Sequence, residues 1–226
     1  MVCTKEMITI NISEEIRTLW PHFAGVALFA KVENNPHNEA LWNEINAFSA
    51  DYKATHEIED IKTNAAIAAT REAYKKFGKE PNRYRPSAEA LRRRILRDLP
   101  LYEIDTLVDL VNLVSLRTGY SIGGFDAGKI EGDCLTLGIG KAGEPYEGIG
   151  KGILNIEGLP VYRDRVGGIG TPTSDHERTK ISLQTTSFLA LINGYSGKDA
   201  LPQAVEYMHS LLGRYMNAKD VEIVYY

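Results

Sequence analysis

Long apolar runs, cysteines and repeats are scarce in this chain of 226 residues. Its longest uninterrupted apolar stretch, residues 24–30, is far shorter than the ~20 residues that span a bilayer. Cys3 and Cys134 are too few for a disulfide framework, and no Cys or His spacing matches a zinc site. The N-terminus shows no charged-then-apolar leader, so we expect no signal peptide. These absences predict a soluble, reduced, cytoplasmic protein without a metal site or a membrane partner.

The composition is ordinary for a globular protein. With 43% hydrophobic and 25% charged residues, it disfavours disorder, collagen and coiled coils. No low-complexity tract or obvious linker divides the chain. We therefore expect a single domain over residues 1–226, with an N-terminal α/β part at about 1–78 and a closing helix and strand at about 199–225.

Charge is unevenly distributed along the chain. Nine basic and two acidic residues lie between Lys75 and Arg97, so this segment carries +7 while the whole chain carries −4 and the remainder −11. A local basic block on an acidic protein is typical of a face that binds phosphates. The alternative is a solvated helix face whose charges pair with acids elsewhere.

Helical spacing and strand-forming residues predict an α+β fold. Helices concentrate in the first half and strands follow in the second, which disfavours alternating parallel units. The predicted helices cover residues 38–52, 63–77, 87–99, 105–119 and 199–216. The predicted strands cover residues 7–10, 25–32, 121–125, 133–139, 153–156, 161–163, 187–192 and 221–225.

The helix that follows Ser87 is amphipathic. Ala88, Leu91, Ile95 and Leu99 share one face at helical spacing, and Ser87 is a good N-cap. Arginines 93, 94 and 97 then point away from that face, and Arg92 flanks it. The helix is expected to bury one side and to present guanidinium groups on the other.

The helix at 105–119 is apolar in almost every direction and is expected to be buried on all sides. Asn112 and Ser115 are therefore informative, because a buried amide needs partners or a polar cavity. Two interpretations remain open, an amide that ties down a neighbouring loop and a contact with a ligand.

Residues 138–143 match G-x-G-x-x-G, the glycine pattern of dinucleotide-binding loops. Such a site needs a helix directly after the glycines, whereas Glu144 and Pro145 follow here and indicate a hairpin. Neither Gly140-Lys141 nor Gly150-Lys151 is followed by Ser or Thr, as a Walker A loop requires. We expect no cofactor.

The richest polar segment covers residues 167–180. Its glycines allow close backbone approach, and hydroxyls, acids and an imidazole follow within a few residues, which suits a loop that orients a water and holds a substrate. An ordinary polar turn explains the same composition. The candidate residues are Gly167, Gly168, Thr171, Thr173 and Ser174 for substrate binding, and Asp175, His176 and Glu177 for catalysis.

One stretch resembles a known family. The string DTLVDLVNLVSLRTG at 105–119, followed by IGGFD at 122–126 and KIEGD at 129–133, resembles the B3/B4 domain of the phenylalanyl-tRNA synthetase beta subunit. That family carries V-D-x-x-N-x-V on a helix, then G-x-P-x-H-A-F-D and I-x-G. The basic segment 83–97 and the Gly-Gly-Ile at 167–169 also resemble it. The likeness covers about 75–193.

The resemblance implies a three-layer α+β fold with a β-sandwich of unusual topology and flanking helices. It also implies an editing activity, which hydrolyses the ester of a wrongly charged tRNA where a single binding pocket discriminates poorly. Asn112 matches the family's pocket Asn, Asp126 matches the Asp of its Phe-Asp pair, and Gly123 and Gly124 fall where the family has His-Ala.

Two departures separate this chain from the family pattern. Gly123 replaces the pocket His, and the loop after the Gly-Gly-Ile is about three residues shorter, so the family's hydroxyl-reading Glu has no aligned partner. Glu177 or Asp175 are the possible substitutes. A glycine neither orients a water nor donates a proton, so editing by the same residues is in question.

Three hypotheses follow. The first is a free-standing B3/B4-domain protein, not a complete synthetase, that binds tRNA or aminoacyl-tRNA and acts on it in trans, as an ester hydrolase or as a binder. Its RNA-binding residues are Arg83, Arg85, Arg92, Arg93, Arg94 and Arg97. The alternative is a non-catalytic module that kept the fold and binds a free amino acid or another small molecule. The third is an interaction protein whose basic helix docks an acidic partner.

Overall fold

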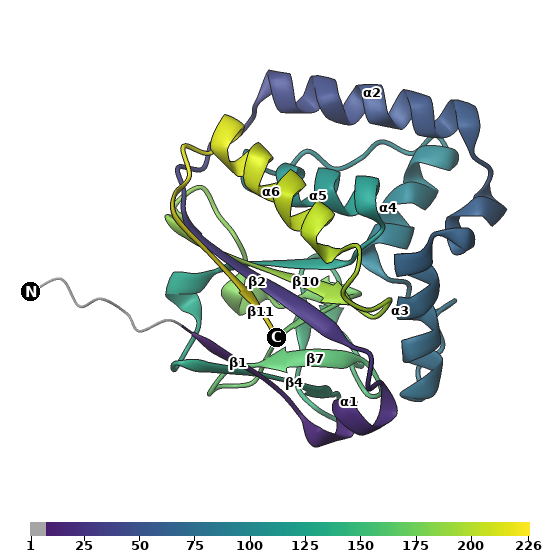
Figure 1. The fold of residues 1–226 in the computed structure, drawn as a ribbon, viewed down its shortest axis with the longest axis vertical. Helices are drawn as coiled ribbons and strands as arrows, with labels where there is room; N and C mark the ends of the chain where they lie inside the picture. The colour runs from purple at the N-terminus through teal and green to yellow at the C-terminus, as the bar shows by residue number, and fades with distance from the viewer. Residues whose placement is uncertain (1–7) are drawn as a thin grey trace, which may run out of the picture.

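A computed structural model describes residues 8–226 and shows three layers (Figure 1). Cys3 and Met7, the first residue of the predicted strand at 7–10, lie outside the described residues. Helices α2 (Glu39–Thr55), α4 (Ser87–Leu96), α5 (Thr106–Thr118) and α6 (Leu201–Tyr215) gather on one side of a four-stranded sheet. A second sheet lies on the other side. The α+β fold class and its layered arrangement are confirmed.

The four-stranded sheet forms the middle layer. Its order is β11 (Lys219–Tyr225), β2 (Ala24–Lys31), β10 (Ser187–Gly194) and β3 (Ile122–Asp126), and all neighbours are antiparallel. Strand alternation sends successive side chains to opposite faces. Thus Leu28 and Ala190 join the core beneath the helices, whereas Ala27 and Leu191 join the core between the sheets.

The five-stranded sheet has the order β1 (Thr9–Ile12), β4 (Cys134–Ile139), β7 (Pro160–Arg163), β8 (Gly168–Thr171) and β9 (Ser174–Asp175). Of the strand pairs in this sheet, β1–β4 is parallel, whereas β4–β7, β7–β8 and β8–β9 are antiparallel. A separate hairpin consists of β5 (Glu147–Gly148) and β6 (Gly152–Ile153). Strand β1 belongs to the five-stranded sheet and β2 to the four-stranded sheet, so residues 9–31 contribute a strand to each of the two sheets.

The remaining helices are α1 (Glu14–Leu19), α3 (Ala65–Lys76) and the short 3-10 segments η1 (Ile58–Thr63), η2 (Ala127–Lys129) and η3 (Glu177–Thr179). The end signals of α5 act as expected. The Asp105 carboxylate accepts from the Val108 N–H (2.9 Å), and Gly119 ends the helix at φ 84°. Within residues 8–226, no helix is long and apolar enough to cross a membrane.

Three local predictions are corrected. The strand predicted at 153–156 is shorter in the structure, where β6 covers Gly152–Ile153. The polar segment at 167–180 is not an open loop, since it contains the β8–β9 hairpin and η3. Ser87 is the first residue of α4, and Pro86 occupies the N-cap. The G-x-G-x-x-G segment forms a turn, in which the Glu144 N–H donates to the Lys141 carbonyl (3.2 Å).

Candidate functional site

A cavity of about 350 Å³ lies where β3 of one sheet meets β9 of the other, beside α5. Its size and mixed lining are those of a small-molecule site. Polar side chains on its wall are Ser87, Asn112, Ser115, Thr171, Ser174, Asp175 and Lys180. The apolar part of the wall is Ile104, Val108, Val111, Ile122, Ile149 and Ile181, with the backbone of Gly124.

One face of α5 forms a wall of the cavity. Val108, Asn112 and Ser115 recur at four- and three-residue spacing and therefore lie on one side of the helix. Val108 and Asn112 are half-buried, so α5 is not enclosed on all sides as its sequence suggested. Among the described residues, neither the Asn112 amide nor the Ser115 hydroxyl has a hydrogen-bond partner. The ligand-contact interpretation of Asn112 is the one that this arrangement favours.

The β8–β9 hairpin forms the opposite wall. The Thr171 hydroxyl donates to the Ser174 carbonyl (3.0 Å) and accepts from the Ser174 N–H (3.1 Å), which fixes the two-residue turn. The Pro172 carbonyl accepts from the Ser87 N–H (2.8 Å) and ties this turn to the start of α4. These bonds hold Thr171, Ser174 and Asp175 on the cavity wall.

Asp175 is the acidic side chain that lines the cavity. The Gly124 N–H donates to its Oδ2 (3.1 Å). Burial raises the pKa of the Asp175 carboxyl to about 7, although the Gly124 N–H and the charge of Lys151 act in the opposite direction. Lys151 is itself held nearby, since its Nζ donates to the Thr173 carbonyl (2.9 Å). The carboxyl is therefore poised to exchange a proton near neutral pH.

Gly123 and Gly124 face opposite sides of β3. A Cβ at Gly123 would lie 2.6 Å from Cζ of Phe125 and 3.3 Å from Oδ1 of Asp175, on the side of the second sheet. A Cβ at Gly124 would instead meet Ile181 at 3.1 Å, on the cavity side. Only Gly124 lines the cavity, and the space that a side chain at Gly123 would occupy is filled by the ring of Phe125.

Both predicted catalytic neighbours of Asp175 lie outside the cavity wall. His176 packs edge-on against Tyr146 (5.0 Å between ring centroids) and its Nδ1 accepts from the Arg178 N–H (3.0 Å). Burial, together with Arg178, lowers the pKa of His176. Glu177 pairs with Lys180 (2.5 Å) and accepts from the Gly150 N–H (3.4 Å).

Four predicted binding residues also lie elsewhere. Asp126 accepts from the Thr185 hydroxyl (3.0 Å) and from the Gly128 N–H (3.0 Å), so it shapes the turn after β3. The Thr173 hydroxyl shares a hydrogen bond with the Tyr74 hydroxyl (2.9 Å) behind the hairpin. Gly167 and Gly168 are not on the cavity wall, and Gly168 packs against Tyr146.

The expected row of free arginines on α4 is corrected. Arg92 is buried, and its Nε and Nη2 donate to the Leu116 carbonyl (3.0 and 2.9 Å). Arg94 donates from Nε and Nη2 to the Pro100 carbonyl (2.8 and 2.5 Å) and lies over the ring of Tyr102. These guanidinium groups serve as intramolecular donors, and the buried one, Arg92, does not lie on the surface as expected.

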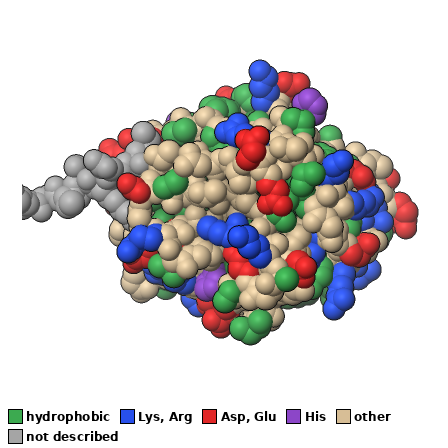
Figure 2. All heavy atoms as spheres, turned by 90° about the horizontal axis from the view of Figure 1, so that it is seen from below, with side chains coloured by type: hydrophobic (Ala, Val, Ile, Leu, Met, Phe, Trp, Pro, Cys, Tyr) green, Lys and Arg blue, Asp and Glu red, His purple; other side chains and the backbone are tan. Residues whose placement is uncertain are grey.

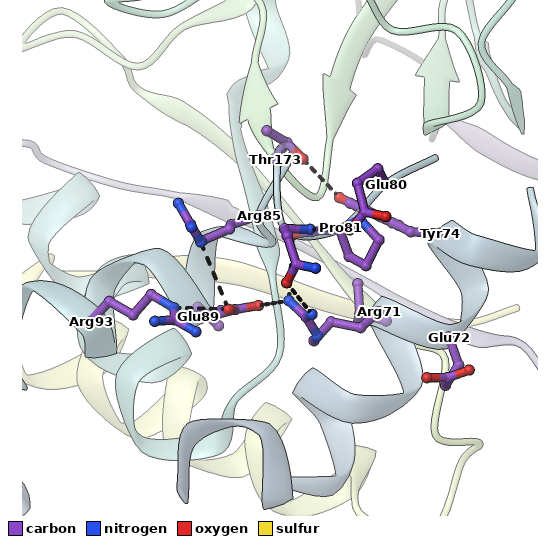
Figure 3. A network of polar contacts seen from close by, with 12 residues as sticks. Arg71, Glu72, Tyr74, Glu80, Pro81, Arg85, Glu89, Arg93 and Thr173 are labelled. Carbon is purple, nitrogen blue, oxygen red and sulfur yellow. Dashed lines mark hydrogen bonds and ion pairs between the residues drawn. The ribbon is translucent and has the colours of Figure 1, made fainter. Parts of the chain in front are cut away.

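Arg93 belongs to a buried ion network around Glu89 (Figure 3). The Glu89 side chain is fully buried, with its Oε2 2.7 Å from Nη1 of Arg71 and its Oε1 2.9 Å from Nε of Arg93. Arg85 is exposed, and its Nε lies 4.0 Å from Oε1 of the same carboxylate. The network joins α3 to α4, so much of the +7 block serves the fold.

Three of the six predicted RNA-binding arginines, Arg83, Arg85 and Arg97, are exposed. Figure 2 shows that, on the face it presents, Lys and Arg side chains lie beside Asp and Glu instead of forming a continuous basic patch. Within residues 8–226, no group of three or more His, Cys, Asp or Glu side chains is arranged to hold a metal ion.

Some cavity residues were absent from the sequence predictions, notably Ser87, Val108, Ile149, Lys180 and Ile181. Val108 was predictable, since it precedes Asn112 by one helical turn. Ile149 comes from the β5–β6 hairpin, whose position over the site depends on long-range contacts such as the bond from the Ile149 N–H to the Asp175 carbonyl (3.0 Å). No local signal in the sequence indicates that contact.

The arrangement defines a layered α+β domain with a cavity at the junction of two sheets. The B3/4 domain family model matches residues 69–213, which is well over half of the chain. The chain belongs to the B3/4 domain family, and the resemblance recognised in the sequence is confirmed.

Among solved structures, the chain is similar to an N-terminal fragment of the phenylalanyl-tRNA synthetase beta-subunit from Pyrococcus horikoshii. The identity is 16% and the TM-score 0.47, with 97% of this chain and 51% of that fragment covered. The chain thus spans about half the length of the fragment. Comparison with curated proteins finds no match.

Proposed function

We propose that this B3/4-domain protein, acting as one unit over residues 1–226, binds aminoacyl-tRNA in the cytoplasm and hydrolyses its ester in trans. The observation that supports this most directly is a single cavity that brings together Asn112, Ser115, Thr171, Ser174 and Asp175. These residues come from α5, β8 and β9, far apart in the sequence. Apolar walls with a few convergent polar groups suit an amino-acid side chain and its polar ester.

Asp175 is the proposed general base. A carboxyl with a pKa of about 7 is half ionised at neutral pH, which suits a group that must take a proton and return it. It removes a proton from a water as the water oxygen bonds to the ester carbonyl carbon. When the bond from that carbon to the ribose oxygen breaks, the proton passes from Asp175 to the ribose oxygen. The amino acid leaves as a carboxylic acid, which then loses the second proton of the water to solvent.

Asn112 and Ser115 are proposed to contact the bound amino acid. Their side chains line the cavity without partners among the described residues, so a ligand supplies the missing hydrogen bonds. The Gly124 N–H already serves Asp175 and is not a free donor for an oxyanion. The Asn112 amide is the better candidate for stabilising the developing charge on the carbonyl oxygen.

The test is a panel of correctly and wrongly charged tRNAs incubated with the purified protein. We expect hydrolysis of at least one ester above the background rate, with Asp175→Asn slower by roughly 10²–10⁴-fold. Asp199→Asn is the matched control, because Asp199 is exposed and does not line the cavity. Background rates for every tRNA would reject the enzymatic proposal.

A second candidate is a non-catalytic module that binds a free amino acid. One observation favours it: no imidazole lines the cavity, since His176 lies outside it and Gly123 stands where the resembling family has His. Thermal-shift screening with free amino acids separates the candidates. Stabilisation by an amino acid, without tRNA affinity and without hydrolysis, supports this module over the hydrolase.

A further inference from the structure

A second cavity, of about 390 Å³, lies at the C-terminal end of α2 and shares no lining residue with the first. Its walls come from α2, η1, the start of α3, α4 and the end of α5. The lining residues are Phe48, Asp51, Tyr52, His56, Asp60, Thr63, Asn64, Arg92 and Arg117. None of them has a role in the proposed hydrolysis.

Aromatic rings form a ladder on one side of this cavity. Phe48, Tyr52 and His56 follow one another at four-residue spacing, so they share one face of α2 and its end. Centroids of Phe48 and Tyr52 are 5.6 Å apart and those of Tyr52 and His56 are 4.1 Å apart, each pair tilted by only 19°. His56 is the exposed end of the stack, where a flat ligand extends it.

Two carboxylates, Asp51 of α2 and Asp60 of η1, also line this cavity. Asp51 and Asp60 are both exposed, and Asp60 has one oxygen engaged by the Glu57 N–H (2.7 Å from Oδ2). Asp51 makes no side-chain hydrogen bond to a described residue. Carboxylates accept hydrogen bonds and cannot donate them when ionised, so they select ligands that carry N–H groups.

A cation completes the cavity. Arg117 is exposed, lies over the rings of Phe48 (5.7 Å) and Tyr207 (5.3 Å), and has no ion pair with any described carboxylate. Arg92 is buried behind Tyr52, 5.2 Å from its ring. The Tyr52 hydroxyl is buried without a well-aligned hydrogen bond within residues 8–226. The cavity thus offers a stacking surface, acceptors and the exposed guanidinium of Arg117, whose charge also lowers the pKa of Glu44.

We propose that this cavity binds an unpaired nucleotide whose base carries an exocyclic amino group. The base stacks on the exposed face of His56 and so extends the stack, its amino N–H donates to Asp51 or Asp60, and its phosphate pairs with Arg117. Single-stranded RNA is read in this way, by stacking on aromatic and His rings and by hydrogen bonds to base edges. The inference goes beyond ester hydrolysis and does not depend on it.

The test is a titration of the full chain with CMP, UMP and ribose 5-phosphate, followed by NMR of the His56 ring. CMP and UMP have the same ring size, but CMP carries an amino group at the position where UMP carries a carbonyl oxygen, which a carboxylate repels. We therefore expect CMP to bind at least fivefold more tightly. His56→Ala should weaken CMP binding roughly tenfold, as expected for loss of one stacking contact. Asp60→Asn with Asp51→Asn should remove the preference for CMP.

His209→Ala and Asp199→Asn are the matched controls, since both residues are exposed and lie outside the cavity, and they should bind CMP as the parent does. Equal affinities for CMP and UMP, equally tight binding of ribose 5-phosphate, or unchanged binding in His56→Ala would overturn the proposal. Because Asp175→Asn disables only the first cavity, CMP binding in that variant separates failure of this inference from failure of the proposed hydrolysis.

Discussion

The backbone N–H of Gly124 donates to the Asp175 carboxylate, with 3.1 Å between the nitrogen and Oδ2. Gly124 lies on β3 of the middle sheet and Asp175 on β9 of the second sheet, so this bond joins the two sheets at the cavity. A side chain at position 124 would occupy cavity space next to Ile181. The hydrogen bond therefore fixes the carboxyl, and the absence of a side chain at Gly124 leaves the cavity space free.

The first prediction concerns pH. The pKa of Asp175 is raised to about 7 in the folded protein, above its ordinary value of 3.8, so the folded state binds more protons than the unfolded state between these values. Stability from this group is present at low pH and is lost as pH rises toward about 7. Between pH 5 and pH 8, the unfolding free energy of the parent should therefore fall by more than about 1 kcal/mol beyond any fall in Asp175→Asn.

Urea unfolding at pH 5 and pH 8 measures this difference. Asp109, whose pKa burial raises to about 6, keeps part of the pH dependence in the variant and should behave identically in both proteins. A variant that loses as much stability as the parent between these two pH values would contradict an enclosed Asp175 carboxyl.

The second prediction concerns the network around Glu89. Glu89→Ala leaves Arg71 and Arg93 without their buried carboxylate, and we expect a loss of about 3–5 kcal/mol of unfolding free energy. Glu72→Ala, which removes an exposed partner of Lys75, should cost less than about 1 kcal/mol. Denaturant titrations of the two variants measure both losses of unfolding free energy. Equal losses in Glu89→Ala and Glu72→Ala would refute the structural role of Glu89.

The third prediction uses neighbouring glycines as mutual controls. Gly123→Ala places a Cβ 2.6 Å from Cζ of Phe125 and should cost about 1–3 kcal/mol of stability by overpacking. Gly124→Ala meets Ile181 at 3.1 Å and reduces the cavity instead, so it should weaken ligand binding or hydrolysis more than stability. Thermal unfolding should be affected more by Gly123→Ala, whereas tRNA hydrolysis should be affected more by Gly124→Ala.

The fourth prediction separates the arginines. Arg97→Ala should leave stability unchanged and weaken tRNA binding, with the slope of log affinity against log salt reduced by about 1. Arg92→Ala should destabilise the fold, because the Leu116 carbonyl loses its buried donors. Filter binding at several salt concentrations, with unfolding curves, tests both. An unchanged salt slope in Arg97→Ala would remove that residue from the RNA surface.

Local signals in the sequence predicted most helices well. For α5, Asp105 and Gly119 marked both ends, and its sequence motif identified the B3/4 family that the family model confirms. Asn112 was singled out because an amide on an apolar helix needs a partner, and it lies on the cavity wall. Such signals depend on neighbours in the chain, which is why they can be recognised without coordinates.

Long-range pairing was harder to predict. The β8–β9 hairpin was expected as a loop, because Gly-rich β8 and the two-residue β9 have weak strand propensity, and its pairing is stabilised by partners from other elements. Arg92 was expected near the surface because charge usually indicates exposure, yet a buried carbonyl at Leu116 holds it inside. Which carbonyl or carboxylate meets an arginine is a property of the folded chain.

The most direct measurement is the rate of ester hydrolysis as a function of pH, under single-turnover conditions, for the most reactive charged tRNA. With Asp175 as general base, the rate should rise with an apparent pKa near 7 and level off above it. Asp175→Asn should flatten this profile and lower its plateau, whereas Asp199→Asn should reproduce the parent. An Asp175→Asn variant that keeps both the rate and the profile would contradict the account.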